Sequence, residues 1–309
     1  MSTEPAALTL SPRRRSSQPR PHRRRAKAPL YIRADRSVTG RIGRGVGWIL
    51  LAVGGAVTLL PFAWMLTTSA KTETDLFGHP TSLLPTHWTF ANYQAIWHEL
   101  PFGRLFVNSI VFAGGVTVVS LLFDSMAAYA LARLEFRGRT AAFYLVVATL
   151  MVPYQITLIP LFELVFHLHW LNTYQGLIVP RATSAFGIFL LRQFFVSIPR
   201  DLDAAARIDG ASELRIYWQI VLPLAKPALA TLAVFQFMNN WNDFLWPLVI
   251  STDVSHRTLP AGLTLFSGQF VIEHGVLMAG AAISLLPLAL AFFLAQRYFV
   301  SGVTTTGLK

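Results

Sequence analysis

The stretch DAAARIDGASELRIYWQIVLPLAKPALA (203–230) decides how the rest of the chain has to be arranged. It begins with charged residues and strong helix formers, and it ends in an apolar run that contains Pro223 and Pro227. Apolar segments long enough to cross a membrane lie on both sides of it. The sequence therefore predicts a compact, charged helix–turn–helix held between two membrane spans.

The composition of the whole chain is typical of a membrane protein. Of its 309 residues, 53% are hydrophobic and 13% are charged, whereas a soluble domain has about a quarter charged residues. The absence of cysteine excludes disulfides and thiolate metal sites. The net charge of +11 would suggest a nucleic-acid partner if it were spread over a soluble surface, but it is concentrated at one end of the chain.

Residues 1–45 form a separate basic region. They hold 12 of the 26 lysines and arginines, are rich in Pro and Ser, and show no apolar period. A chain of this kind cannot bury enough apolar surface to fold by itself. We expect a disordered cytoplasmic tail held near anionic lipid, and no nucleic-acid partner; a nucleic-acid-binding arm is the alternative.

Six segments are long and apolar enough to span the hydrocarbon core as helices. They run approximately over 46–68, 105–131, 141–162, 174–196, 225–250 and 275–296. Prolines inside them are expected to kink the helices rather than end them: Pro153, Pro160, Pro247 and Pro287. The fold class is therefore an all-α polytopic membrane protein with a six-helix membrane domain over 46–296.

The loop charges predict the orientation of these spans. With the N-terminus inside, and leaving the tail aside, 10 basic residues lie on the inner side and 4 on the outer side. Basic residues concentrate on the cytoplasmic side of membrane proteins. Both termini, the loop at about 197–223 and a C-terminal tail at 297–309 are therefore expected in the cytoplasm.

The opening stretch contains clear helix signals. Asp201 and Asp203 suit the first turn of a helix, Gly210 suits its end, and Ser212 can cap a second helix. The second helix is expected to present one apolar face: Leu214, Tyr217, Trp218 and Val221. Such a pair either packs on its own bundle or the lipid interface, or fits a groove on a soluble partner.

This stretch resembles the cytoplasmic EAA loop of binding-protein-dependent ABC importer permeases, in particular the MalG-like family of carbohydrate-uptake subunits. The matching residues are Ala205, Ala206, Asp209, Gly210, Ala211, Leu222 and Pro223. Further stretches that look like this family are LLPTHWTFANY (83–93), AAYALARLEF (127–136), MVPYQITLIPLF (151–162), FGIFLLRQFF (186–195), NDFLWPL (242–248) and YFVSGVTTTGLK (298–309). The resemblance covers nearly everything after the N-terminal tail.

The resemblance implies a type I importer permease fold and a transport role without catalysis. The implied partners are a second permease subunit, two ATPase subunits that bind the ATP, an extracytoplasmic solute-binding protein, a sugar or oligosaccharide, and membrane lipid. This chain has no Gly-Lys-Ser/Thr nucleotide loop and is expected to hold no cofactor or metal. The implied location is the plasma membrane of a bacterium or archaeon. The solute itself is not identified by the sequence.

In such permeases the loop seats in a groove on an ATPase and transmits its motion. The residues expected to do so here are Asp203, Ala205, Ala206, Asp209, Gly210, Ala211, Leu214, Tyr217, Trp218 and Pro223. The family's leading glutamate is replaced by Ala204. Asp203 is adjacent, but one residue turns a helical side chain by about 100°. Either Asp203 substitutes for the glutamate or the ion pair to the ATPase is absent.

A polar stripe marks the fifth predicted span: Gln236, Asn239, Asn240 and Asp243. It either lines a sugar pathway or joins helices by hydrogen bonds. Trp241 and Trp246 could stack on a sugar or lie in the membrane interface.

Two further features lie outside the loop and the stripe. Asp124 inside the second span is expected to pair with Arg192; the alternative is a proton relay of a gradient-driven carrier. At the C-terminus, the resemblance suggests a contact with the ATPases, where a frayed end is the alternative: Thr304, Thr305, Thr306 and Gly307.

Overall fold

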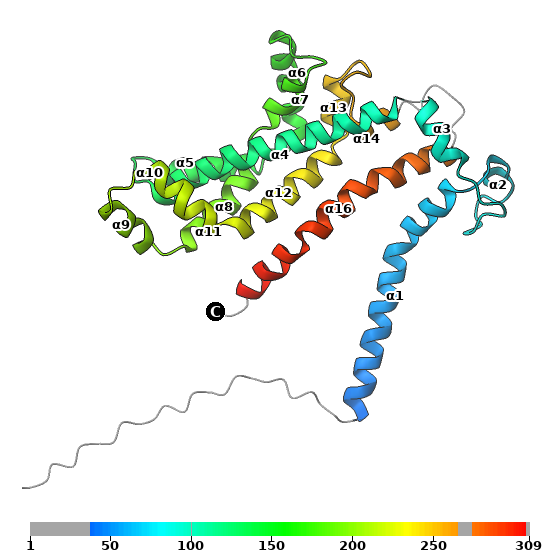
Figure 1. Cartoon of the computed structure of the whole chain (residues 1–309), viewed down its shortest axis with the longest axis horizontal. Coiled ribbons are helices and arrows are strands. Elements are labelled where there is room, and N and C mark those ends of the chain that lie inside the picture. The colour runs from blue at the N-terminus through cyan, green and yellow to red at the C-terminus, as the bar shows by residue number, and fades with distance from the viewer. Residues whose placement is uncertain (1–37, 100, 265–273, 307–309) are drawn as a thin grey trace, which may run out of the picture. The chain divides into compact units, whose positions relative to one another are not determined.

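The computed structural model describes residues 38–99, 101–264 and 274–306, and this part of the chain is helical almost throughout (Figure 1). Its β pairing is one antiparallel bridge between Lys71 and Trp88. The chain divides into two units, Met1–Thr58 and Leu59–Lys309. Of the basic tail predicted over 1–45, residues 1–37 lie outside the described part.

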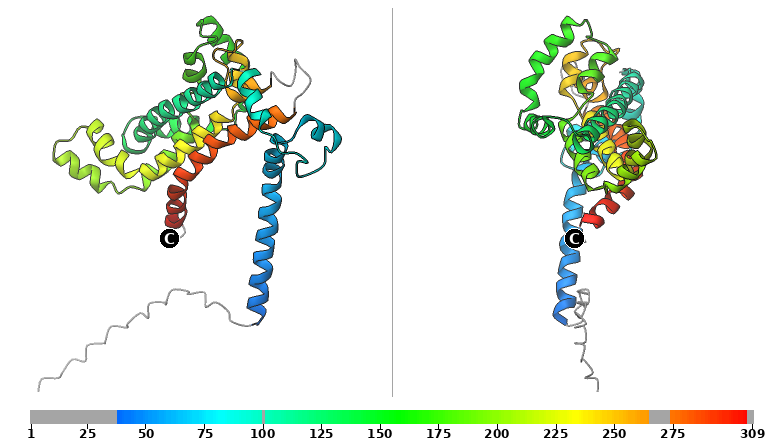
Figure 2. Two further views of the ribbon diagram at one scale, coloured as in Figure 1. Left: turned by 45° about the vertical axis from the view of Figure 1, so that its right-hand side comes forward. Right: turned by 90° about the vertical axis from the view of Figure 1, so that its left-hand side faces the viewer.

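The second unit is built around four helices: α4 (Phe102–Arg133), α8 (Ala185–Ser197), α12 (Lys226–Trp241) and α16 (His274–Thr306). α4 contacts both α8 and α12, and α12 also contacts α16, so that these helices run side by side (Figures 1 and 2). The buried face of α4 carries small side chains such as Ala113, Ser120 and Ala128. Small residues let neighbouring backbones approach closely, which is the usual way membrane helices pack.

The remaining helices connect or extend this group. They are α1 (Val38–Ser69), α2 (Glu73–Gly78), α3 (Ala91–Glu99), α5 (Arg139–Thr149), α6 (Tyr154–His167), α7 (Tyr174–Ile178), η1 (Val179–Arg181), α9 (Asp201–Ile208), α10 (Glu213–Ile216), η2 (Tyr217–Val221), α11 (Leu222–Leu224), α13 (Leu245–Ile250) and α14 (Leu259–Leu263). In Figure 1, α3 and α14 lie at the beginning of α4, whereas α9 and α10 lie by its other end.

Three of the six predicted spans are unbroken helices in the structure. The helices over Gly45–Ser69, Phe102–Arg133 and His274–Leu294 are long and apolar enough to cross a membrane. α1 begins at Val38 and α16 continues to Thr306, so both extend beyond the predicted spans, and α16 includes most of the expected C-terminal tail.

The other three predicted spans are broken, which corrects the expectation of continuous helices. α5 ends at Thr149, Pro153 is the N-cap of α6, and the two helices meet at an angle of 99°, so that Pro153 separates two helices instead of kinking one. The fourth span is divided into α7, η1 and α8, and the fifth into α12 and α13. By length and composition, the described residues contain three spans, or up to five if each bent helix pair crosses as one.

A folded segment follows α1 in the second unit. The buried Lys71 ammonium donates to the Ser82 carbonyl, and the Asp75 carboxylate accepts from the backbone N–H groups of Thr86 and His87. Hydrogen bonds from Thr86 and His87 hold the pKa of Asp75 below its usual value of 3.8. These contacts give the LLPTHWTFANY stretch a defined structure.

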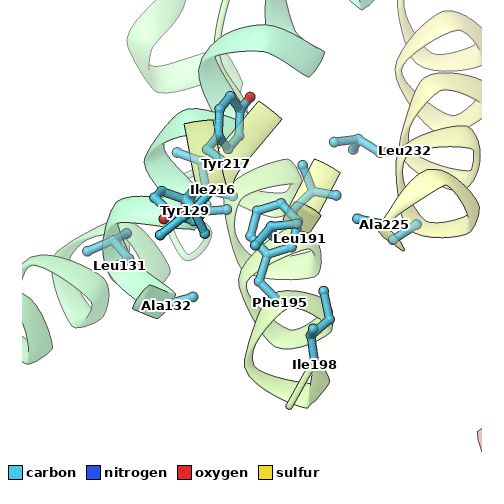
Figure 3. Close-up of a cluster of buried hydrophobic side chains, with 14 of the residues drawn as sticks. Tyr129, Leu131, Ala132, Leu191, Phe195, Ile198, Ile216, Tyr217, Ala225 and Leu232 are labelled. Atoms are coloured by element: carbon cyan, nitrogen blue, oxygen red, sulfur yellow. The ribbon is translucent and has the colours of Figure 1, made fainter. Parts of the chain in front are cut away.

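The largest cluster of buried apolar side chains lies between α4, α8 and the segment before α12 (Figure 3). Tyr129 of α4 and Leu191 and Phe195 of α8 meet Ile216 and Tyr217 in this cluster. The opening stretch of the sequence therefore contributes its own side chains to the core of the bundle.

Candidate functional site

The helix–turn–helix predicted from the opening stretch is present. α9 ends at Ile208, and Gly210 follows with a φ of 77°, a backbone conformation that favours glycine. The Ser212 hydroxyl accepts from the Arg215 N–H and caps α10, as expected. A π-helical turn, η2, then leads through α11 to α12.

The expected single apolar face of the second helix is wrong. Tyr217 and Val221 are buried, whereas Leu214 is 64% and Trp218 51% exposed. Neighbouring positions on a helix point about 100° apart, so Tyr217 can be buried while Trp218 beside it is exposed. The helix therefore has one apolar side in the core and a second that faces outward.

Exposed apolar side chains are also present on α9. Ile208 is 87% exposed, and the alanines at 204 and 205 are exposed as well. We call Ala204, Ala205, Ile208, Leu214 and Trp218 the apolar patch. Ile208 was not among the predicted loop residues, although its position before Asp209 and Gly210 in a charged helix could have identified it.

The predicted loop residues thus separate into two groups. Those that are exposed are Ala205, Asp209, Gly210, Leu214, Trp218 and Pro223, with Ala211 half-buried. Those that are buried are Asp203, Ala206 and Tyr217. The first group is accessible to another molecule, and the second joins the loop to the bundle.

Asp203 is held by a buried ion pair with Arg133, the last residue of α4. The Arg133 Nη1 atom lies 3.0 Å from the Asp203 Oδ2 atom, and the two side chains are 1% and 4% exposed. Arg133 Nη2 also donates to the carbonyls of Phe195 and Ile198, at the C-terminal end of α8. One guanidinium therefore ties together α4, α8 and α9.

This geometry answers whether Asp203 replaces the missing glutamate. Its carboxylate points into the protein toward Arg133, so it is not available to a partner. The exposed position of the glutamate holds Ala204. Arg133 is one of the ten inner basic residues counted for the orientation of the spans, and no local pattern predicted its contact with Asp203.

A second polar link joins α4 to the loop. The Arg207 Nε donates to Glu213 Oε1 at 2.8 Å, and the Tyr129 hydroxyl of α4 donates to Glu213 Oε2 at 2.8 Å. The Glu213 carboxylate raises the pKa of Arg207 above its ordinary value. Deeper in the bundle, the Tyr217 and Ser125 hydroxyls share a hydrogen bond of 2.7 Å. Polar contacts along its length therefore attach the loop to α4.

A cavity of about 780 Å³ lies between α5, α6, α8 and α12. Gln236, Asn239 and Asn240 of the predicted polar stripe line it, together with Tyr154 and Arg181. Small-molecule sites typically enclose about 300–1,000 Å³. Three of the four stripe residues therefore face a space in which a solute fits.

Asp243, the fourth stripe residue, is not part of the cavity wall. Its Oδ2 atom lies 2.8 Å from Nη2 of Arg181, and its Oδ1 atom accepts from the Trp246 N–H. The Arg181 guanidinium also lies over the Tyr154 ring, 4.4 Å from its centre. Asp243 therefore holds and neutralises Arg181, which is one of the four outer basic residues counted for the orientation of the spans.

The expected ion pair between Asp124 and Arg192 does not form. Asp124 accepts hydrogen bonds from Ser120 Oγ at 2.6 Å and from the Ser184 N–H at 2.9 Å, while Arg192 stacks on Phe143 at 3.7 Å. Within 45–98, 101–264 and 274–294, no ion pair involves Asp124. These contacts connect α4 to the residue that starts α8.

Both tryptophans near the stripe are core residues, so the expectations that they stack on a sugar or lie in the membrane interface are both wrong. Trp241 and Trp246 are buried, and their Nε1–H groups donate to the carbonyls of Ser284 and Leu177. At the C-terminus, the backbone of Thr304, Thr305 and Thr306 belongs to α16, but their side chains and Gly307 lie outside the described residues. The suggested tail contact stays a prediction.

Comparison with known proteins identifies the family. The model of a family described as "Binding-protein-dependent transport system inner membrane component" matches residues 121–305. The arabinooligosaccharides transport system permease protein AraQ of Halalkalibacterium halodurans is 36% identical over 267 residues, which is 84% of this chain and 96% of that protein. The diacetylchitobiose uptake system permease protein NgcG of Streptomyces coelicolor is 34% identical over 259 residues, 82% of this chain and 85% of that protein.

A solved structure is similar as well. It is that of a bacterial ABC transporter involved in the import of the acidic polysaccharide alginate, and one of its chains is 28% identical with a TM-score of 0.77. The match covers 85% of this chain and 98% of that chain. The resemblance found in the loop and the other motifs is therefore confirmed, and the chain belongs to the family of binding-protein-dependent transport system inner membrane components, the multi-pass permeases of ABC importers.

Proposed function

We propose that this chain is one permease subunit of a heteromeric ABC importer that moves a sugar or oligosaccharide across the membrane. It pairs with a second permease, receives its solute from an extracytoplasmic binding protein, and is driven by two ATPase subunits. The proposal includes six membrane crossings with both termini in the cytoplasm, in a bacterial inner membrane. The uneven distribution of basic residues between the predicted inner and outer loops supports this orientation.

The observation that carries the proposal is the apolar patch. Ile208, Leu214 and Trp218 are exposed on a segment that is otherwise charged, and the core of the protein does not use them. Apolar side chains gathered on a polar surface mark a site of protein interaction. Because polar contacts attach this segment to α4, movement of a partner docked on the patch is passed to the membrane helices.

The absence of the family's glutamate changes how the ATPase is held. With Ala204 exposed and Asp203 turned inward, docking rests on shape and apolar contact. An exposed ion pair contributes only about 0–1 kcal/mol, so binding of the ATPase does not require the ion pair of the missing glutamate. The contact of Thr304, Thr305, Thr306 and Gly307 with the ATPases is part of the same proposal and rests on the family resemblance.

The solute path runs through the cavity lined by Gln236, Asn239 and Asn240. Amide groups both donate and accept hydrogen bonds, which matches the hydroxyl groups of a sugar. The relatives support a carbohydrate: the printed names of two permeases include arabinooligosaccharides and diacetylchitobiose, and the solved importer takes an acidic polysaccharide. These names leave both uncharged and anionic carbohydrates open.

Substitution of Gly210 by valine tests the coupling role. The φ of 77° strains a β-branched residue, by roughly 1–3 kcal/mol, although a Cβ would meet no atom within 4 Å. We expect the variant to insert into the membrane but to lose ATP-driven uptake or to purify without its ATPase. The measurement is purification of the tagged chain from its native membrane in mild detergent, with identification of the proteins that accompany it.

Gly138→Val is the matched control, because Gly138 has a φ of 87° and also has no atom within 4 Å of a Cβ. It lies outside the apolar patch, so it should retain the ATPase and uptake. Normal uptake and normal complex yield in Gly210→Val would contradict the coupling role. A wild-type chain that purifies alone and transports without ATP would contradict the importer itself.

A further inference from the structure

The charges at the cavity wall cancel. Among the described residues that line the cavity, Arg181 is the one with a charged side chain, and Asp243 lies 2.8 Å from it. The two side chains are 22% and 11% exposed, so water screens the pair little. An anionic solute would therefore meet an arginine that already has its counter-ion.

The wall also contains an unsatisfied neutral acceptor. Asn240 is 3% exposed, and its Nδ2 atom donates to the Gln236 carbonyl at 2.7 Å. That bond fixes the amide orientation, because an amide oxygen could not bond to a carbonyl. Asn240 Oδ1 is left buried without a hydrogen-bond partner among the described residues. A buried acceptor of this kind costs about 1–3 kcal/mol until a donor arrives, and a sugar hydroxyl supplies one. This acceptor favours a hydroxyl-rich solute, and the discrimination against acidic sugars depends on the Arg181–Asp243 pair.

The layer behind the wall does not add positive charge. Gln236 Nε2 donates to Ser120 Oγ, which in turn donates to Asp124, and Asp124 also accepts from the Ser184 N–H. Gln236 and Ser184 both line the cavity, so these hydrogen bonds connect its wall to a second carboxyl group, that of Asp124. Seen from the cavity, this wall is neutral or negative.

We infer that the cavity selects an uncharged, hydroxyl-rich carbohydrate against uronate- or phosphate-bearing ones, and that Asp243 determines this selectivity by neutralising Arg181. The inference rests on the proposed function, since it names the class of solute for the same path. Without Asp243, Arg181 would be free to bind a carboxylate, for which its planar guanidinium is well suited.

Saturation-transfer NMR on the purified complex tests the inference. The tagged chain, with the subunits that accompany it but without binding protein, is mixed with two pools of trisaccharides. One pool is neutral (maltotriose, cellotriose and arabinotriose), and the other is acidic (trigalacturonate and trimannuronate). We expect the wild-type complex to give about tenfold more transfer to the neutral pool, because a carboxylate that enters the cavity without a free cation to pair with loses its hydration uncompensated.

Two variants separate the contribution of this chain from that of its partners. Asp243→Asn should raise the signal of the acidic pool relative to the neutral pool by about tenfold, because it frees the Arg181 charge. The double variant Arg181→Gln with Asp243→Asn removes both charges and should restore the preference for neutral sugars. Asn242→Ala is the control, because Asn242 is exposed and its amide donates to its own helix, so the preference should not change.

The outcomes distinguish this inference from the proposed function. If the wild-type complex binds the acidic pool as well as the neutral one, or binds neither, the inference is wrong although the importer assembles. An unchanged preference in Asp243→Asn would also overturn it. If no ATPase or second permease accompanies the chain, the proposed function fails before any sugar is added.

Discussion

At the scale of single residues, neighbours in the sequence have opposite roles. Asp203 is buried in an ion pair with Arg133 and joins the loop to two helices. Ala204 beside it is exposed, at the position of the glutamate in the EAA motif. Likewise, Tyr217 is part of the core and Trp218 part of the apolar patch. One step along a helix, about 100°, is enough to separate an internal contact from an external one.

Replacing Asp203 by alanine leaves the Arg133 charge buried without its partner. Breaking a buried ion pair costs about 3–5 kcal/mol, so we expect a clear fall in the melting temperature of the detergent-purified protein. Asp201→Ala is the control on the same first turn of α9, where the side chain is exposed, and it should change the melting temperature little. Equal melting temperatures of the two variants would show that the Arg133–Asp203 pair does not stabilise the loop.

At the scale of elements, the helix after Ser212 belongs to both the core and the surface. Its inner side packs on Tyr129 and Phe195, and its outer side carries Leu214 and Trp218. The π-helical turn at Tyr217–Val221 contains residues of both sides, with Tyr217 buried and Trp218 exposed. The proposed coupling role uses both sides, since a partner docked on the outer side acts on a helix whose inner side is part of the core.

Serine substitutions on the two sides of this helix should have different effects. Trp218→Ser removes a large exposed ring. Loss of an aromatic side chain at the centre of an interface costs about 2 kcal/mol of binding free energy, so ATPase association should weaken more than tenfold while the melting temperature stays the same. Tyr217→Ser removes a buried ring and should destabilise the protein itself by about 3–5 kcal/mol. Binding assays on purified subunits and thermal unfolding distinguish the two. Undiminished association of Trp218→Ser would argue against the apolar patch as the docking surface.

At the scale of the whole molecule, the proposed orientation is argued from loop charges rather than from the tail alone. Ten basic residues remain on the predicted inner side and four on the outer side when the tail is left out. The rule counts such residues near the ends of the spans. The proposed topology with both termini inside therefore does not require the first 37 residues.

Deletion of residues 2–37 should leave the orientation unchanged. Because the chain has no cysteine, a cysteine placed at Asp209 or at Thr81 can be labelled alone. An impermeant maleimide added to whole cells should react with the Thr81→Cys variant, and with the Asp209→Cys variant only after the membrane is opened. Labelling of Asp209→Cys in intact cells would contradict the proposed topology. If the labelling pattern changed only in the protein that lacks residues 2–37, the tail would be what determines the orientation.

Local patterns were sufficient for much of this protein. The helix pair, its turn at Gly210 and its Ser212 cap follow from short-range rules, and the family follows from motifs in order along the chain. The breaks in the third, fourth and fifth predicted spans could not be predicted from apolar content. Apolar runs fix the length available for a helix, but whether Pro153 kinks a helix or separates two depends on the packing of both parts.

What the sequence alone determined is the membrane class, the family, and the position of the loop and the polar stripe. These depend on composition and on spacings of a few residues. The tertiary structure decided which stripe residues face the cavity and how each charge is used. Arg181 and Asp243 are far apart in the sequence and become an ion pair only when η1 is brought close to the end of α12, and Arg133 reaches Asp203 in the same way. Such pairs depend on contacts between distant segments, and no local pattern records them.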